Sequence, residues 1–181
     1  MSRNKRIVIL SHCILNQNSV VREWERAEAG FNEIIKIVLD KNIAIFQLPC
    51  PEFAFLGEDR RPMSKEEYDT TDYRKYNKEL CLNIVNQIAE YKKHDYQLLG
   101  IVGISESPSC DTILQKGVFM EELFTQLKEK KIDLDTFDIQ ADYTQDNCKN
   151  TEDGFKKWLS SKINYTNLPE DNSLLKEENL I

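Results

Sequence analysis

Residues 98–104 of the chain read LLGIVGI, and residues 105–110, which follow directly, read SESPSC. The first stretch has the length of a β-strand, and its uninterrupted apolar character predicts burial on both faces. Strands of this kind are typical of parallel sheets, which helices cover on each side. The sequence therefore predicts a central parallel strand that ends in a polar loop carrying Cys110.

Two further apolar runs end in the same way. Residues 7–10 read IVIL and are followed by a polar loop, residues 11–19, that contains Cys13. Residues 43–48 read IAIFQL and stop at Pro49-Cys50-Pro51, where two prolines cannot donate the amide hydrogen bonds of a sheet. We therefore expect three strands, each with a cysteine shortly beyond its carboxyl end.

Helical patterns separate the strands. They cover residues 31–39, 72–93, 118–130 and 151–163, and a weaker strand is predicted at residues 132–139. In the first helix one stripe is apolar and Asn42 is placed to end the helix; the residues of the stripe are Phe31, Ile34, Ile35, Val38 and Leu39. The order β-α-β-α-β-α-β-α predicts an α/β fold with a single open, mainly parallel sheet covered by helices, a Rossmann- or flavodoxin-like three-layer arrangement. We expect Trp24 and Trp158 to cover the sheet.

The length of 181 residues favours one α/β domain, residues 1–163, with a polar C-terminal tail, residues 164–181. Residues 52–71 form a charged connection that is too long for an ordinary turn and that is typical of a lid or binding loop. Within it, Arg60 and Arg61 could hold an anionic substrate, although charged residues on loops are usually solvated.

Composition indicates a cytoplasmic protein that acts on small molecules. The basic amino terminus precedes only four apolar residues, which is too few for a signal peptide, and no stretch approaches a membrane span. A net charge of −7 predicts no broad attraction to nucleic acid or anionic membranes. Five widely spaced cysteines are an odd number and do not suggest a disulfide framework, so we expect reduced thiols.

The carboxyl ends of parallel strands meet at one edge of a sheet, so Cys13, Cys50 and Cys110 are predicted to share a crevice. Three thiolates select soft centres such as zinc or iron–sulfur clusters, and the chain lacks the close cysteine pairs of structural zinc sites. Cys81, inside a helical pattern, is expected to pack in the core, and Cys148 to be a surface thiol or an incidental neighbour of the site. A nucleotide-binding flavodoxin-like domain has less support, because residues 11–19 contain no glycine to cradle a phosphate.

The sequences around these cysteines carry a more specific signal. Residues 11–15 (SHCIL), 49–52 (PCPE) and 107–110 (SPSC) resemble the three cysteine motifs of the 2-thiouracil desulfurase family, in order and spacing over roughly the first 140 residues. One departure is that Asp111 stands where the family motif continues with glycine.

The resemblance implies that Cys13, Cys50 and Cys110 bind a [4Fe–4S] cluster, which is sensitive to oxygen, and that its fourth iron takes the sulfur of a thiocarbonyl substrate. The implied activity is a desulfidase, in which the open iron acts as a Lewis acid and takes up sulfide. Glu52 is the best-placed carboxylate for acid–base catalysis, and Ser107 and Ser109 could donate hydrogen bonds to the substrate or the cluster. A zinc-thiolate enzyme on the same fold, and a non-enzymatic iron–sulfur sensor or sulfide carrier, are the alternatives.

Overall fold

The computed structural model describes residues 3–144 and 147–165 of the chain. Its elements, in chain order, are β1 (Arg6–Leu10), α1 (His12–Leu15), η1 (Gln17–Ser19), α2 (Asn32–Asp40), β2 (Ala44–Gln47), α3 (Pro51–Leu56), α4 (Lys65–Tyr68), α5 (Thr71–Lys93), β3 (Gln97–Ile104), α6 (Val118–Glu129), β4 (Thr136–Ile139) and α7 (Lys149–Tyr165). Of the predicted tail, residues 166–181 lie outside the described residues.

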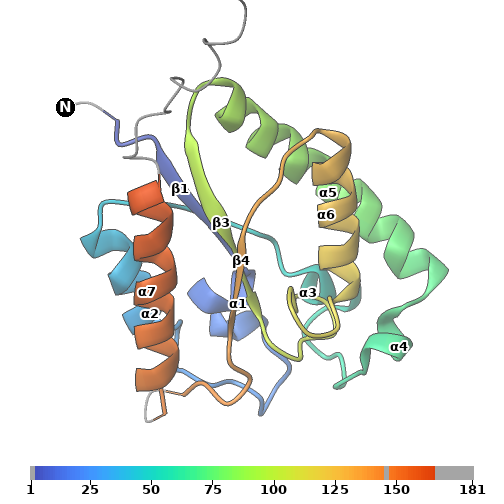
Figure 1. The fold of residues 1–181 in the computed structure, drawn as a ribbon. Helices are drawn as coiled ribbons and strands as arrows, with labels where there is room; N and C mark the ends of the chain where they lie inside the picture. Colours follow the sequence, from blue (N-terminus) through green and yellow to red (C-terminus); the bar gives the residue numbers. More distant parts are fainter. Residues whose placement is uncertain (1–2, 145–146, 166–181) are drawn as a thin grey trace, which may run out of the picture.

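The four strands form one parallel sheet in the order β2-β1-β3-β4 (Figure 1). The predicted α/β fold with a parallel sheet is therefore confirmed. The two central strands are β1 and β3, whose residues are almost all buried, as their continuous apolar sequences predict. The edge strand β2 is half exposed, and it is shorter than the apolar run from residue 43 to residue 48, whose end residues Ile43 and Leu48 are buried just outside it.

Helices cover both faces of the sheet (Figure 1). Alternate residues of β1 point to opposite sides, because side chains alternate along a strand. Val8 and Leu10 belong to a core with residues of α2 and α7, whereas Ile9 belongs to a second core with residues of α5 and α6. The predicted three-layer arrangement follows directly from this division.

The predicted burial differs from the observed burial at a few positions. In α2 the buried stripe is Ile34, Ile37 and Val38, whereas Leu39 is 56 % exposed. Trp158 does cover the sheet, because its ring packs beside Phe137 and against the backbone at Gly100. Trp24 does not: it is 62 % exposed, in the connection between η1 and α2. The reason is that a tryptophan outside any helix has no fixed face toward the core.

Four short helical segments were not predicted. They are α1 and η1 in the first loop, and α3 and α4 in the long connection between β2 and α5. Each has only three to six residues, too short for a hydrophobic period to show in the sequence. α3 begins with proline at its first turn and α4 has a full capping box between Ser64 and Glu67, so local capping rather than periodicity defines them.

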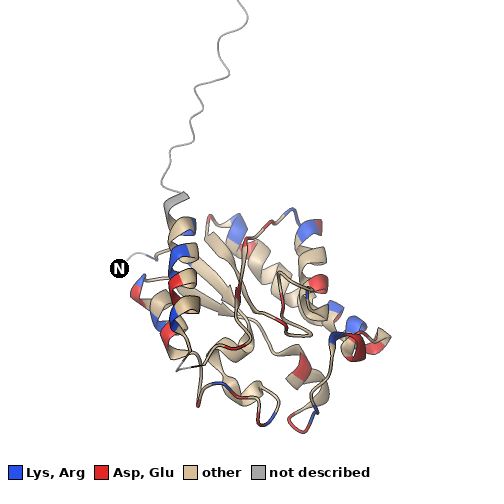
Figure 2. Ribbon diagram, turned by 60° about the horizontal axis from the view of Figure 1, so that its bottom comes forward, with Lys and Arg blue, Asp and Glu red and all other residues tan. Residues whose placement is uncertain are grey.

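Basic and acidic residues are interspersed along the outer helices and loops, whereas the strands are nearly free of them (Figure 2). This distribution agrees with the absence of a strongly basic composition. None of the described helices combines the length and apolar character that a membrane crossing requires.

Candidate active site

The three predicted cysteines lie at the carboxyl edge of the sheet. Cys13 is the second residue of α1, which follows β1 after one residue, and Cys50 is the N-cap residue of α3, after β2. Cys110 lies in the loop between β3 and α6 and is buried. Backbone hydrogen bonds hold the three loops together. Leu48 N–H donates to the Leu10 carbonyl at 2.8 Å, and Ser11 N–H to the Val102 carbonyl at 3.0 Å.

All three thiols line a single cavity of about 270 Å³. The same cavity is lined by Glu52 and Ser107, so the structure brings five of the six predicted site residues together. Apolar and aromatic wall residues come from separate segments: Val20, Val21 and Trp24 before α2, Pro62 and Met63 before α4, Ile104 at the end of β3, Pro108 after it, and Ala141 after β4. The cavity is the size of a small molecule, at the lower end of the range of ligand pockets.

The environment of the thiols disfavours their ionisation in the absence of a cation. Burial raises the pKa of Cys13 to about 12, with a further contribution from Cys50. Burial also raises the pKa of Cys50, and it raises that of Cys110 together with the neighbouring thiols of Cys13 and Cys50. These mutual effects mean that the three sulfur atoms lie close enough to repel one another as thiolates. A bound cationic centre removes this penalty, since metal binding displaces the thiol protons.

The donor set consists of three cysteine thiols around one cavity, and thiolates are the ligands of soft centres such as zinc and iron–sulfur clusters. Within residues 3–144 and 147–165, no group of three or more His, Cys, Asp or Glu side chains is arranged to hold a single metal ion. In addition, the buried Ser11 hydroxyl, which lies in the turn between β1 and Cys13, reaches the Cys110 thiol and lowers its pKa against the larger effect of burial. These features agree with a [4Fe–4S] group at the three cysteines.

Glu52 is held by two groups that the sequence did not single out. Its Oε2 lies 3.6 Å from Nε of Arg60 and accepts a hydrogen bond of 3.2 Å from the Tyr68 hydroxyl. The expectation that Arg60 is solvated is wrong, because its side chain is 2 % exposed and donates to the carbonyls of Gly57 and Ser19, whereas Arg61 is exposed. Burial raises the pKa of Tyr68, with a further contribution from Glu52, so this phenol stays protonated and donates.

The two predicted serines occupy different positions. Ser107 lines the cavity, and its Oγ accepts the N–H of Cys110 at 3.0 Å, which fixes the turn that presents this thiol. Ser109 is fully buried, is not among the residues that line the cavity, and its hydroxyl lies 2.8 Å from the Tyr73 hydroxyl. These contacts favour a direct role in the site for Ser107 and a structural one for Ser109.

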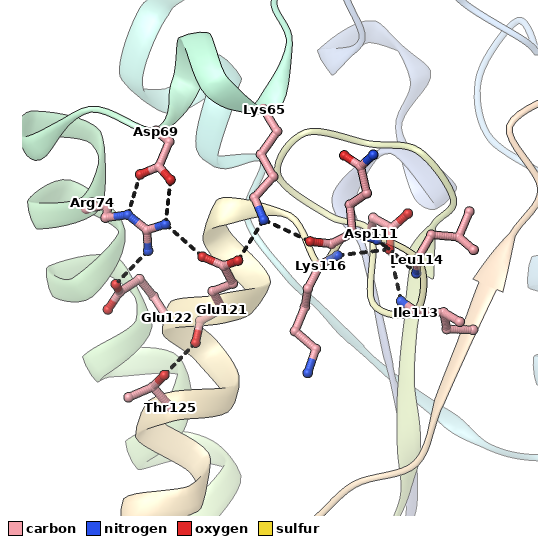
Figure 3. Close-up of polar contacts among 11 residues, drawn as sticks. Lys65, Asp69, Arg74, Asp111, Ile113, Leu114, Lys116, Glu121, Glu122 and Thr125 are labelled. Atoms are coloured by element: carbon pink, nitrogen blue, oxygen red, sulfur yellow. Dashed lines mark hydrogen bonds and ion pairs between the residues drawn. The ribbon is translucent and has the colours of Figure 1, made fainter.

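Two buried aspartates fix the loop around Cys110. Oδ1 of Asp111 accepts backbone N–H groups from Ile113 and Leu114 at 2.9 and 2.8 Å (Figure 3). Its Oδ2 accepts the backbone N–H of Glu106 at 2.8 Å. Asp138, at the carboxyl-terminal half of β4, accepts the N–H and the hydroxyl of Thr112. The residue that departs from the family motif, Asp111, therefore anchors the loop on both sides of the cysteine.

A charged cluster fastens the connection containing Arg60 and Tyr68 to the cysteine loop. Lys65 Nζ of α4 contacts Glu121 of α6 at 2.7 Å and the carbonyl of Gln115 at 2.8 Å (Figure 3). Arg74 of α5 joins the same Glu121 carboxylate at 2.7 Å and also pairs with Asp69. The connection, predicted as a lid or binding loop, thus contributes walls to the cavity and is held in place on its outer side.

Arg26 and Trp24 also line the cavity and were not identified as site residues from the sequence. Both lie in residues 20–31, a stretch without regular secondary structure, so no periodic pattern indicates which side chains face the sheet edge. The only sequence signal was the occurrence of Trp and two Arg within five residues, at 22–26.

The remaining cysteines lie away from this cavity. Cys81 is fully buried in the core between α5 and α6, which confirms the predicted packing role. Cys148 is partly exposed, packs against the core formed with α2 and α7, and lines a separate pocket with Glu152. A larger hollow of about 550 Å³ lies at the opposite edge of the sheet, but it is lined mainly by exposed residues of α5 and the amino terminus, with no cysteine.

Fold and site together define a parallel α/β protein with three thiols gathered at the carboxyl edge of its sheet. Residues 5–129 match the sequence model of the family described as "Putative 2-thiouracil desulfurase". Because this match covers more than half of the chain, the protein belongs to that family, as the cysteine motifs predict. The matched range contains all three cysteines, Glu52, Arg60 and Tyr68.

One curated relative is an uncharacterized protein of Methanocaldococcus jannaschii. It is 48 % identical over 130 residues, which are 72 % of this chain and 83 % of the relative. No solved structure matches the chain.

Proposed function

We propose that this protein is an iron–sulfur-dependent desulfidase that removes sulfur from a small thiocarbonyl compound in the cytoplasm. The observation that carries the proposal is the convergence of Cys13, Cys50 and Cys110 on one small cavity together with Glu52. Membership of the 2-thiouracil desulfurase family supports the reaction class.

The three cysteines would hold a [4Fe–4S] cluster, which supplies a soft Lewis acid at the iron without a protein ligand. The chain's own residues bind and orient the substrate. The apolar walls formed by Val20, Met63 and Pro108 suit the face of a small ring and exclude bulk water. A cavity of about 270 Å³ that also houses a cluster leaves room for a base-sized ring rather than a nucleotide.

Glu52 is the proton acceptor in this proposal. Its carboxylate is 14 % exposed, and the Arg60 guanidinium and the Tyr68 hydroxyl orient it at the cavity wall. From there it can take a proton from the water that adds to the thiocarbonyl carbon and return it to the departing sulfur or ring nitrogen. Ser107 fixes the backbone N–H of Cys110 and thereby the position of that thiol.

The test is anaerobic purification followed by iron, sulfide and zinc analysis, absorption spectroscopy, and an assay of sulfide release from 2-thiouracil. We expect a brown protein with about four irons per chain. Cys50→Ala should lose the cluster and the activity, whereas the matched control Cys81→Ala should keep both, because Cys81 packs in the core away from the cavity.

Three results would separate the alternatives. A colourless, zinc-loaded protein from the anaerobic preparation would overturn the cluster. A cluster that binds sulfide without turning over 2-thiouracil or other thioamides would replace the enzyme with a sensor or sulfide carrier. Sulfide release that persists in Cys50→Ala would show that the three thiols are not the site.

A further inference from the structure

The structure places a cation, Arg26, beside the three thiols without a direct ion pair to any described residue. Burial lowers its pKa, whereas the Cys13 thiol and the Asp142 carboxylate raise it, and Asp142 does so from beyond ion-pair distance. Arg26 is half-buried, lines the cavity, and lies with its guanidinium 5.1 Å from the ring centroid of Phe31. Its Nη1 donates hydrogen bonds to the carbonyls of Gln140 and Ala141 at 3.1 and 2.7 Å. Within residues 3–144 and 147–165, no carboxylate oxygen lies within 4.0 Å of this guanidinium.

Arg26 is tied to Cys13 through one intermediate residue. The Gln17 side chain accepts the backbone N–H of Arg26 at 2.9 Å and donates to the Cys13 carbonyl at 2.7 Å. Gln17 is buried, so this bridge fixes the spacing between the two segments. The positive charge of Arg26 also lowers the pKa of the Cys13 thiol, against the larger effect of burial, which agrees with a short separation.

The other arginines near the cavity are neutralised. Arg60 pairs with Glu52, and Arg22 pairs with Glu58 and Asp59 on the surface. A partly buried cation is costly unless an opposite charge faces it. Three thiolates around a cubane core of the usual 2+ charge leave one net negative charge. Of the two arginines among the described residues that line the cavity, Arg60 is paired with Glu52, whereas Arg26 has no carboxylate within 4.0 Å and can balance this charge.

We propose that Arg26 is the charge partner of the cluster at Cys13 and raises its reduction potential. The proposal rests on the proposed function, because it requires the cluster, but it does not depend on substrate turnover. Reduction adds one further negative charge to the cluster, so a fixed cation at the cavity wall stabilises the reduced state more than the oxidised state. Arg26 is thus a tuning and positioning residue, not a ligand.

The experiment is an anaerobic redox titration of the purified, cluster-loaded protein, followed by absorption and by electron paramagnetic resonance of the reduced state. Arg26→Gln should make reduction less favourable by about tenfold in the equilibrium constant, which is about 59 mV for a one-electron couple. Arg26→Lys keeps the charge and should restore most of the potential. The matched control is Arg22→Gln, four residues earlier, whose charge is paired at the surface and whose loss should leave the potential unchanged.

A second pair of variants keeps the proposal testable if Arg26→Gln does not fold. Ala141→Glu would place a carboxylate beside Arg26, since the Ala141 carbonyl accepts from it, and should lower the potential, whereas Ala141→Gln should not. Equal potentials in the wild type and in the charge-altering variants would overturn the proposal while leaving the desulfidase intact. A wild-type protein without any cluster would overturn both.

Discussion

Asp111 offers a quantitative test of how the cysteine loop is held. The change is Asp111→Ala, which removes a buried carboxylate that accepts three backbone N–H groups at 2.8–2.9 Å and two more, from Gln115 and Lys116, at 3.3 Å. Hydrogen bonds to a charged group are each worth about 1.5–3 kcal/mol. Residues 113–116 are exposed, so in the variant their amides can form hydrogen bonds to water instead. We therefore take a net loss of about 1 kcal/mol of unfolding free energy for each of the three short hydrogen bonds.

The expected loss is therefore about 3 kcal/mol of unfolding free energy, or a melting temperature lower by roughly 6–12 °C for a chain of this size. Urea and thermal unfolding of the cluster-free protein measure it, with Asp133→Ala, a change at an exposed aspartate, as the matched control. A loss below about 1 kcal/mol, or one no larger than that of the control, would refute the view that Asp111 anchors the loop.

Further predictions concern packing, charge and the site. Gly103→Ala should destabilise the fold by about 1–3 kcal/mol or prevent folding, because a Cβ there would lie 2.3 Å from Asp138 Oδ1 and 2.4 Å from the Cys110 carbonyl oxygen. Gly154→Ala, in an exposed part of α7 where the nearest atom is 3.7 Å from the new Cβ, should instead raise the unfolding free energy by up to about 1 kcal/mol in the same assay. Burial raises the pKa of Glu121, but Lys65 and Arg74 lower it more, so its stabilising effect is present above the ordinary pKa of glutamate and is lost as the pH falls through the lowered value. Thermal melts should show Glu121→Gln less stable than the wild type at pH 7 and nearly equal to it at pH 2.5, and a difference that does not change with pH would contradict the assignment. Tyr68→Phe removes the hydroxyl that orients Glu52, so kcat for sulfide release should fall by about tenfold or more while the iron content of the protein stays the same. An unaltered kcat would exclude a role for this hydroxyl in the reaction.

The parts of the fold that were predictable are those where burial alone determines the residue pattern. The apolar runs of β1 and β3 and the helical stripe of α5 are long enough for their periodicity to identify them, and the position of a cysteine beyond each strand predicts a shared edge. The short segments α3 and α4 are defined by capping groups, which leave a weaker signal, and α1 has four residues, too few for a periodic pattern.

The side chains at the cavity that were predictable are the three thiols, Glu52 and Ser107. Arg60 was expected to be solvated because the loop around it is charged, yet it is buried, with an ion pair to Glu52 and hydrogen bonds from its two Nη atoms to carbonyls. Nothing local distinguishes Arg60 from the exposed Arg61, since the difference arises from a tertiary contact with a residue eight positions earlier. Arg26 was missed for the same reason: its partners are carbonyls of residues 140 and 141, more than a hundred positions away.

The separation of the three cysteines along the chain has a consequence for how the protein is made. Cys13 and Cys110 are brought to one cavity only when β3 has paired with β1 and the loop after it has closed. A cofactor held by all three thiols would therefore complete its set of protein ligands only after the chain has been synthesised past Cys110 and β3 has paired with β1. The order of the strands in the chain thus makes Cys110 the last of the three ligands to become available.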